Sequence, residues 1–307
     1  MKLVRTEDAV GQVLCHDITQ IIPGVVKDAV FRKGHIVTEE DIPVLLSVGK
    51  ENLYIWEKQE GMLHENEAAE ILRQICQGEH MHPSEVKEGK IELIADCEGV
   101  LKINTEKLNA VNNLGEMMIA SRHGNFPVKT GDKIAGTRII PLVIEEEKMQ
   151  KACEVAGKEP IFRILPYQKK KAGIVTTGSE VYYHRIEDKF TPVVIEKLKE
   201  CGVTEVKQIQ CNDDHEMIME AIQTLIEDGS DLIVCTGGMS VDPDDRTPFA
   251  IKNACTEVVT YGTPVLPGAM FMLAYCEKEG RQIPVMGLPG CVMYAKRTIF
   301  DLVLPRI

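Results

Sequence analysis

The stretch DLIVCTGGMSVDPDDRTPFAI, residues 231–251, decides the fold of the second half of the chain. It opens with a short apolar run, DLIVC, that is typical of a strand buried on both faces. A glycine pair and an acidic segment follow. Thr247-Pro248 then marks a helix start, because proline is favoured in the first helical turn. A buried strand, a glycine-rich loop and a helix in this order indicate an α/β domain with a parallel sheet.

The same alternation continues on both sides of this stretch. A further helix begins at Thr191-Pro192, where threonine is expected to cap and proline to start the first turn. Apolar periodicity predicts strands at 173–177, 206–209 and 284–288, and helices at 214–226 and 292–304. We therefore predict a three-layer α/β/α domain with a mostly parallel sheet over residues 170–307.

The first half of the chain is less regular. A boundary is expected at LPYQKKK, residues 165–171, where a proline and three lysines interrupt the apolar pattern. The segment Lys129-Thr130-Gly131-Asp132 is typical of a tight hairpin. Helices are predicted near 41–48, 65–76 and 106–119, and strands within 90–104 and 128–144. We interpret residues 1–165 as a smaller α+β region that can divide into two lobes.

Composition narrows the class of protein. The 307 residues are 44% hydrophobic, which is too apolar for a disordered chain, and the net charge of −12 argues against nucleic-acid binding. The sequence has no run of about 18 apolar residues, so no membrane span is predicted. Its opening MKLVRTEDAVGQ lacks the apolar stretch of a secretion signal. The 10 cysteines never stand at CxxC spacing. We expect a cytoplasmic protein with reduced thiols and no membrane partner.

Three glycine-rich loops follow predicted strands. In an open parallel sheet, ligands bind at the carboxyl ends of the strands. Each loop offers backbone N–H groups near a helix start, which is how proteins hold phosphate groups and other oxyanions. One such loop alone is more typical of a tight turn, whereas three at one edge of a sheet favour an anion site. The loops are TTGSE at 176–180, TGGMS at 236–240 and GLPG at 287–290.

Aspartates accompany two of the strand ends. Asp242, Asp244 and Asp245 follow the second loop, and Asp213 stands at the end of another predicted strand beside Asp214. Carboxylates in this number suit Mg²⁺ bound together with substrate phosphates. The alternative is an acidic turn exposed to solvent, with Asp214 capping the next helix. For Asp242 and Asp244 the two interpretations have equal support, whereas the position of Asp245 before Thr247-Pro248 favours a functional role.

With these loops in view, the run TGGMSVDPDDRTPFAI resembles the signature of the molybdopterin-binding superfamily. That group includes molybdopterin adenylyltransferases, molybdopterin molybdotransferases and competence-damage-inducible proteins. Ser240-Val241 is similar to the molybdotransferase element, whereas Asp244-Asp245-x-Thr247 is similar to the competence-damage element. The likeness covers about residues 170–307, and further elements agree with it: TTGSEV at 176–181, LPG at 266–268 and GLPG at 287–290.

The resemblance implies a ligand and a set of roles. Molybdopterin is a pterin that carries a dithiolene and a phosphate, and in the transferase reaction its adenylylated form receives molybdate. Asp245 and Asp242 are implied as catalytic residues that hold Mg²⁺ with Asp244 and Asp213 while the pyrophosphate is cleaved. Gly237, Gly238 and Ser240 are implied at the phosphate, and 287–290 at the pterin. The implied cofactor-binding residues are Thr177, Gly178, Ser179, Glu180, Gly237, Gly238, Ser240, Thr247, Pro267, Gly268, Gly287, Leu288, Pro289 and Gly290.

Departures from the molybdotransferase pattern keep three functions open. Ala269 stands where those enzymes have a lysine, and Cys291-Val292 stands where they have Asn-Pro. We expect a molybdotransferase-like enzyme of molybdenum cofactor biosynthesis that forms a homo-oligomer and serves a molybdoenzyme apoprotein. The alternatives are a non-catalytic molybdopterin carrier or sensor, and a Mg²⁺-dependent nucleotide pyrophosphatase of the competence-damage type.

Overall fold

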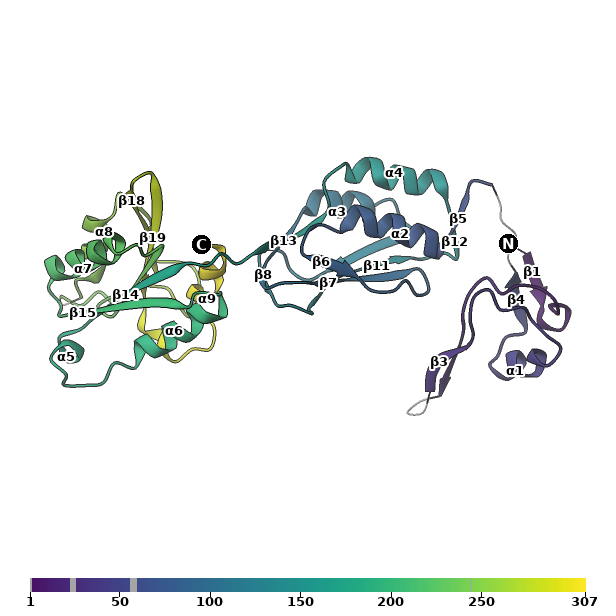
Figure 1. The fold of residues 1–307 in the computed structure, drawn as a ribbon, viewed down its shortest axis with the longest axis horizontal. Helices are drawn as coiled ribbons and strands as arrows, with labels where there is room; N and C mark the ends of the chain where they lie inside the picture. Colours follow the sequence, from purple (N-terminus) through teal and green to yellow (C-terminus); the bar gives the residue numbers. More distant parts are fainter. Residues whose placement is uncertain (1, 23–25, 56–59, 244) are drawn as a thin grey trace. The chain divides into compact units, whose positions relative to one another are not determined.

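The computed structural model describes residues 2–22, 26–55, 60–243 and 245–307. The chain divides into two compact units (Figure 1). The first unit comprises Met1–Cys97, Leu101–Gly124 and Lys129–Ile164, and the second comprises Glu98–Val100, Asn125–Val128 and Leu165–Ile307. In the described part of the chain, no helix combines the length and the apolar character needed to span a membrane.

The first unit mixes helices with short antiparallel strands. Its largest sheet has the order β6-β7-β11-β9, and α2 packs on β7 and β11. The helices are α1 (Asp41–Ser47), α2 (Glu65–Cys76), α3 (Thr105–Asn112) and α4 (Glu146–Ala156). The strands are β1 (Lys2–Arg5), β2 (Ile18–Ile22), β3 (Val26–Phe31), β4 (Asn52–Ile55), β5 (Met62–His64), β6 (Met81–Pro83), β7 (Lys90–Ala95), β9 (Met117–Ser121), β11 (Lys133–Ile139) and β12 (Val143–Glu145).

Two predictions in the first half are wrong for local reasons. The helix predicted near 106–119 ends at Asn112, whose side chain bonds the backbone of Ile119 through both its amide nitrogen (3.0 Å) and its oxygen (2.8 Å), so that the chain reverses into β9. The turn at 129–132 exists, but it does not join a hairpin. The strand before it, β10 (Pro127–Val128), pairs with β8 (Gly99–Ile103), whereas β11 pairs with β7 and β9. Helix α4 was not predicted.

The second unit contains the six-stranded sheet, in the order β15-β14-β16-β19-β18-β17. The first four strands are parallel, and β18 and β17 continue the sheet in antiparallel pairing. The predicted mostly parallel sheet is confirmed. The strands are β14 (Lys171–Thr177), β15 (Glu205–Cys211), β16 (Leu232–Thr236), β17 (Glu257–Tyr261), β18 (Met272–Lys278) and β19 (Arg281–Leu288), and β13 (Phe162–Pro166) leads into the sheet.

Helices cover both faces of this sheet, as the three-layer prediction requires (Figure 1). Residues alternate across a strand, so β16 contributes Ile233 and Cys235 to one core and Leu232 and Val234 to the other. The first core lies under α7 (His215–Glu227) and α8 (Thr247–Ala254). The second lies under α6 (Phe190–Glu200) and α9 (Ile299–Val303).

Helix starts in this unit depend on carboxylates. Asp214 caps α7 by accepting hydrogen bonds from the N–H groups of Glu216 (2.9 Å) and Met217 (3.1 Å). The predicted Thr191 cap is wrong. Helix α6 begins at Phe190, two residues before the predicted first helical residue Pro192, and Asp188 accepts from the N–H groups of Phe190 and Thr191.

The closing helix predicted at 292–304 is also wrong, because three short elements occupy this segment. They are the 3-10 helix η2 (Gly290–Met293), helix α9 and the 3-10 helix η3 (Leu304–Arg306). Thr298 and Asp301 form a capping box that starts α9 afresh.

Candidate functional site

The three glycine-rich loops leave the sheet at one edge. Strands β14, β16 and β19 are parallel neighbours, and Thr176 pairs with Thr236, which pairs with Leu288. Because these three residues are in register near the carboxyl ends of their strands, the loops that follow begin side by side. This edge is the place where open α/β sheets bind ligands.

A cavity of about 380 Å³ lies between the second and third loops. Six of the predicted cofactor-binding residues line it, together with Asp245, which was predicted as a catalytic residue and metal ligand. Of the described residues in the first loop, none lines it. Phe190, Met239 and Met270 were not singled out by the sequence, because their apolar side chains are typical of core positions. The described lining residues are Phe190, Gly237, Gly238, Met239, Ser240, Asp245, Met270, Leu288, Pro289 and Gly290.

Residues of the first loop pack against the second loop and hold its glycine turn. Gly237 has a φ of +88°, and a Cβ at this position would lie 2.3 Å from the carbonyl oxygen of Thr177. The Thr177 hydroxyl donates to the carbonyl of Thr236 at 3.1 Å and accepts from the Thr247 hydroxyl at 3.0 Å. Since Thr177 and Thr247 are both buried, their hydroxyls hold the glycine turn in place.

Backbone N–H groups remain available at the cavity. Within the described residues, the N–H groups of Gly238, Met239 and Gly290 donate to no protein acceptor. The next N–H, of Ser240, donates to the Asp245 carboxylate at 2.8 Å. All five residues line the same cavity. N–H groups without a protein partner beside a cavity can bind oxygen atoms of a ligand.

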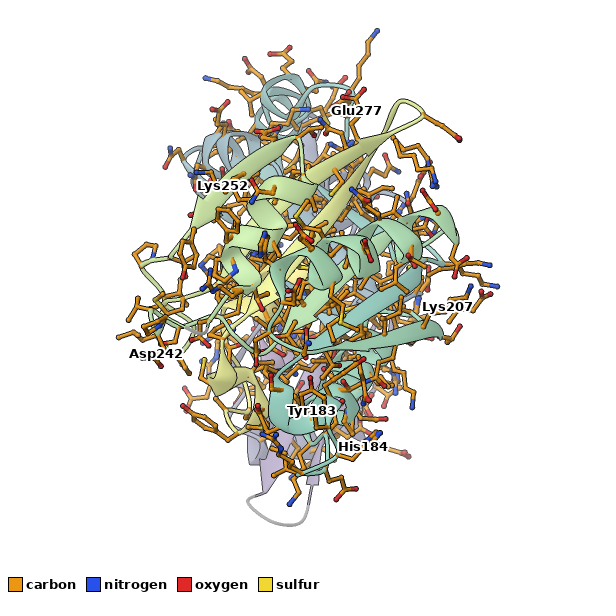
Figure 2. All side chains as sticks on the ribbon, turned by 90° about the vertical axis from the view of Figure 1, so that its left-hand side faces the viewer. Tyr183, His184, Lys207, Asp242, Lys252 and Glu277 are labelled. Atoms are coloured by element: carbon orange, nitrogen blue, oxygen red, sulfur yellow. The ribbon has the colours of Figure 1, made fainter. Side chains whose placement is uncertain are left out.

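The predicted metal ligands do not form a cluster in the part of the chain that the structure describes. Asp213 accepts from the N–H of Ser179 (2.8 Å) in the first loop. Asp242 is exposed at the margin of the unit, and only its carbonyl contacts Asp245 (Figure 2). Asp244 lies outside the described residues. No group of three or more His, Cys, Asp or Glu among the described residues could hold a metal ion. Asp213, Asp242 and Asp245 therefore do not converge on one metal site in the part of the chain that the structure describes.

Three other predicted contacts lie behind the cavity wall or outside it. Gly268 is buried against α9, where an added Cβ would meet the Ile299 side chain at 2.4 Å. Gly287 approaches Met239 so closely that a Cβ would lie 2.6 Å from its sulfur. Pro267 is exposed and does not line the cavity. Gly268 and Gly287 thus allow close packing in this structure.

Tyr261 belongs to the surroundings of the site, although the sequence did not indicate it. It is the last residue of β17, and its hydroxyl donates to the carbonyl of Met239 at 3.3 Å. Burial, and then the negative charge of Asp245, raise the pKa of Tyr261. The missed signal was the β-rich sequence EVVTY at 257–261, which forms an edge strand and positions this ring.

The fold and the cavity define an α/β domain with a cavity at the carboxyl ends of its parallel strands, bordered by two glycine-rich loops. Residues 173–307 match a family model described as a probable molybdopterin binding domain. A second model, described as a domain of unknown function, matches residues 3–57.

Curated relatives match a shorter segment. A CinA-like protein of Mycobacterium tuberculosis is 35% identical over 85 residues, which is 28% of this chain and 20% of the relative. A CinA-like protein of Mycobacterium avium gives the same identity and coverage. The chain thus spans one fifth of the length of these relatives.

Solved structures resemble the second half of the chain. The tungsten cofactor synthesizing protein MoaB of Pyrococcus furiosus is 22% identical with a TM-score of 0.38, covering 45% of this chain and 91% of that one. The protein CinA of Thermoplasma acidophilum is 18% identical with a TM-score of 0.32, covering 39% of this chain and 88% of that one.

Proposed function

We propose that the second unit binds molybdopterin and that the protein acts in molybdenum cofactor biosynthesis. The observation that carries this proposal is the cavity itself, in a domain of the molybdopterin-binding family. Its volume is in the range of small-molecule sites. Its apolar walls suit a flat ring, and its unpaired N–H groups suit the oxygen atoms of a phosphorylated ligand.

The reaction we propose for the bound ligand is insertion of molybdate into adenylylated molybdopterin. The chain contributes fixed N–H donors at Gly238, Met239 and Gly290, which would stabilise negative charge on the ligand without reorganising. Asp245 is the carboxylate that lines the cavity, and we propose that turnover depends on it. Self-association and delivery to a molybdoenzyme apoprotein stay predictions from the sequence.

Gly290 offers a clean test of binding. It lines the cavity, its φ is ordinary, and an added Cβ would meet no described atom within 4 Å. Gly290→Val therefore adds bulk beside the cavity with no clash at its Cβ. Gly136→Val is the matched control, since Gly136 also has an ordinary φ and open space at its Cβ position but lies in β11 of the first unit and does not line the cavity.

The full-length chain would be incubated anaerobically with molybdopterin and separated by gel filtration, and the retained pterin would be oxidised and measured by fluorescence. Gly290→Val should weaken binding about tenfold or more, which corresponds to about 1.4 kcal/mol. Gly136→Val should bind like the wild type. Equal retention by the wild type and Gly290→Val would place the ligand elsewhere.

Two observations support a second candidate function, a nucleotide pyrophosphatase of the competence-damage type. They are the CinA-like relatives and the Asp245-x-Thr247 spacing. Two incubations with Mg²⁺ distinguish the transferase, the pyrophosphatase and the carrier. One contains adenylylated molybdopterin and molybdate, and the other contains ADP-ribose. AMP release that requires molybdate supports the transferase, and cleavage of ADP-ribose alone supports the pyrophosphatase. Binding without turnover supports a carrier or sensor. Asp245→Ala should abolish either activity.

A further inference from the structure

Two free thiols meet where helix α8 ends against the sheet. Cys255 directly follows the last residue of α8, and Cys276 lies in β18. The Cys276 thiol donates to the carbonyl of Ala254 at 3.5 Å. On the other side of Cys255, the N–H of Thr256 donates to the carbonyl of Tyr275 at 3.0 Å. Both neighbours of Cys255 thus contact β18 beside Cys276, and the two thiols form a hydrogen bond with each other.

The strand order separates Cys276 from the other cysteines of the first core, Cys211 and Cys235. Cys235 lies on β16, and β19 stands between β16 and β18. Two strands separated by a third are about 10 Å apart. A disulfide needs Cα atoms within about 7 Å of each other, so Cys235 is too far from Cys276. Cys211 lies still farther away, on the edge strand β15. Among the described cysteines of this core, Cys255 is therefore the partner within reach of Cys276.

The two thiols differ in exposure and in acidity. Cys276 is 5% exposed, whereas Cys255 is half-buried, so a reagent in solution has better access to Cys255. The hydrogen bond that the Cys255 thiol donates stabilises the Cys276 thiolate, and it lowers the pKa of Cys276. The same hydrogen bond, followed by burial, raises the pKa of Cys255. When the pair loses one proton, the remaining proton is therefore shared between the two sulfur atoms.

We propose that Cys255 and Cys276 form a reversible disulfide bond that ties the end of α8 to β18, with a small-molecule disulfide such as glutathione disulfide as the oxidant. The Cys255 thiolate attacks one sulfur of glutathione disulfide, which breaks the S–S bond and releases one glutathione. Cys276 then loses its proton, and its thiolate attacks Sγ of Cys255 and expels the second glutathione. The two protein thiols lose two electrons and two protons in all, and glutathione disulfide is reduced to two glutathione thiols.

The bond anchors a helix that also supports the glycine turn. Helix α8 begins at Thr247, whose hydroxyl bonds that of Thr177, and it ends at Ala254, next to Cys255. The bond to Cys276 fixes the far end of this helix to the sheet. It also closes a loop of about 20 residues, which restricts the unfolded chain and so stabilises the folded unit. Oxidation should therefore raise the unfolding temperature of the second unit by about 5–15 °C.

One tryptic peptide reports on the bond. Trypsin releases Cys255 and Cys276 together in residues 253–278, because no lysine or arginine lies between Lys252 and Lys278, and the peptide contains no other cysteine. The reduced full-length chain would be incubated with glutathione disulfide, alkylated with N-ethylmaleimide, digested and analysed by mass spectrometry. We expect the peptide to change from doubly alkylated to unalkylated and two hydrogens lighter. Dithiothreitol added before alkylation should restore the doubly alkylated form.

Cys255→Ser is the informative variant, because serine keeps the size of this half-buried side chain but cannot form the bond. Its unfolding temperature, measured by calorimetry, should not rise with glutathione disulfide. Cys291→Ser is the matched control, since Cys291 is also half-buried in the second unit, and it should keep both the bond and the rise.

Three results would overturn the proposal. The first is a peptide that stays doubly alkylated under conditions that modify the exposed thiol of Cys153. The second is a glutathione adduct on Cys255 that does not close onto Cys276. The third is a bond that forms without raising the unfolding temperature, because α8 would then gain no anchor. No molybdopterin is present in these experiments, so their results are independent of the proposed function.

Discussion

Gly237→Ala should strongly destabilise the second unit. The backbone at Gly237 has a φ of +88°, which costs a residue with a side chain about 1–2 kcal/mol. The new Cβ would also lie 2.3 Å from the carbonyl oxygen of Thr177. Thr177 has little freedom to move, because it is buried and its hydroxyl bonds both neighbouring segments. Relief of such a contact typically costs about 1–3 kcal/mol, so the total is about 2–5 kcal/mol.

Gly229→Ala separates the two contributions. Gly229 has nearly the same φ of +87°, but an added Cβ would meet no described atom within 4 Å. It should therefore show only the conformational cost of about 1–2 kcal/mol. The difference between the two variants isolates the close approach of the glycine loop to Thr177.

Calorimetry of the full-length chain, with hydrogen exchange of β14 and β16 to assign the transition, measures this difference. For a domain of about 140 residues, each kcal/mol lowers the transition by about 2–5 °C, so Gly237→Ala should lose on the order of 10 °C. Equal losses in Gly237→Ala and Gly229→Ala would refute the reasoning, since the backbone contact would then impose no constraint of its own.

Two further predictions concern buried charge. His64 is 1% exposed, and burial lowers its pKa. Below about pH 6.5 the imidazole therefore takes up a proton in the unfolded chain before it does so in the folded one, and the stability of the first unit falls. The urea midpoint should be lower at pH 5 than at pH 7, and His64→Gln should reduce this difference. Lys197 pairs with Asp301 at 2.6 Å, and their side chains are only 10% and 4% exposed. Lys197→Met should cost about 3 kcal/mol in denaturant unfolding, whereas exposed Lys199→Met should change stability by less than about 0.5 kcal/mol; equal effects would contradict a role for burial.

The local pattern of apolar residues was sufficient to place an element where that element is long and periodic. Helix α2 occupies the predicted residues 65–76, and β16 lies within one residue of the predicted apolar run. The same pattern did not predict β17 and β18, the antiparallel strands at one edge of the sheet. Strand β17 exposes most of its side chains, and no strand was predicted over β18, although its residues MLAYC at 272–276 are a continuous apolar run. The closing segment failed for another reason, since its apolar residues continue across a break that the Thr298 cap imposes.

The candidate site shows the same division. The motifs locate the glycine-rich loops, but they do not show the role of every residue in them. Thr177 and Thr247 were predicted to contact the cofactor, whereas in the structure their hydroxyls bond each other and hold the turn. Phe190 and Met270 line the cavity and Tyr261 supports it, although Phe190 lies 47 residues before Gly237 and the other two lie 24 or more residues after it. No short pattern in the chain could announce them.

The amino-acid sequence by itself determined the alternation of strands and helices in the second half and the chemistry of its loops, because burial periodicity and the conformational freedom of glycine are local properties. The tertiary structure decided which loops share a cavity and which only support it. It also decided that Asp245 lines the cavity, whereas Asp213 accepts from the N–H of Ser179 and the exposed Asp242 does not line the cavity. That outcome depends on the order in which distant strands pair, and strand order is set by packing of the whole sheet between its helices.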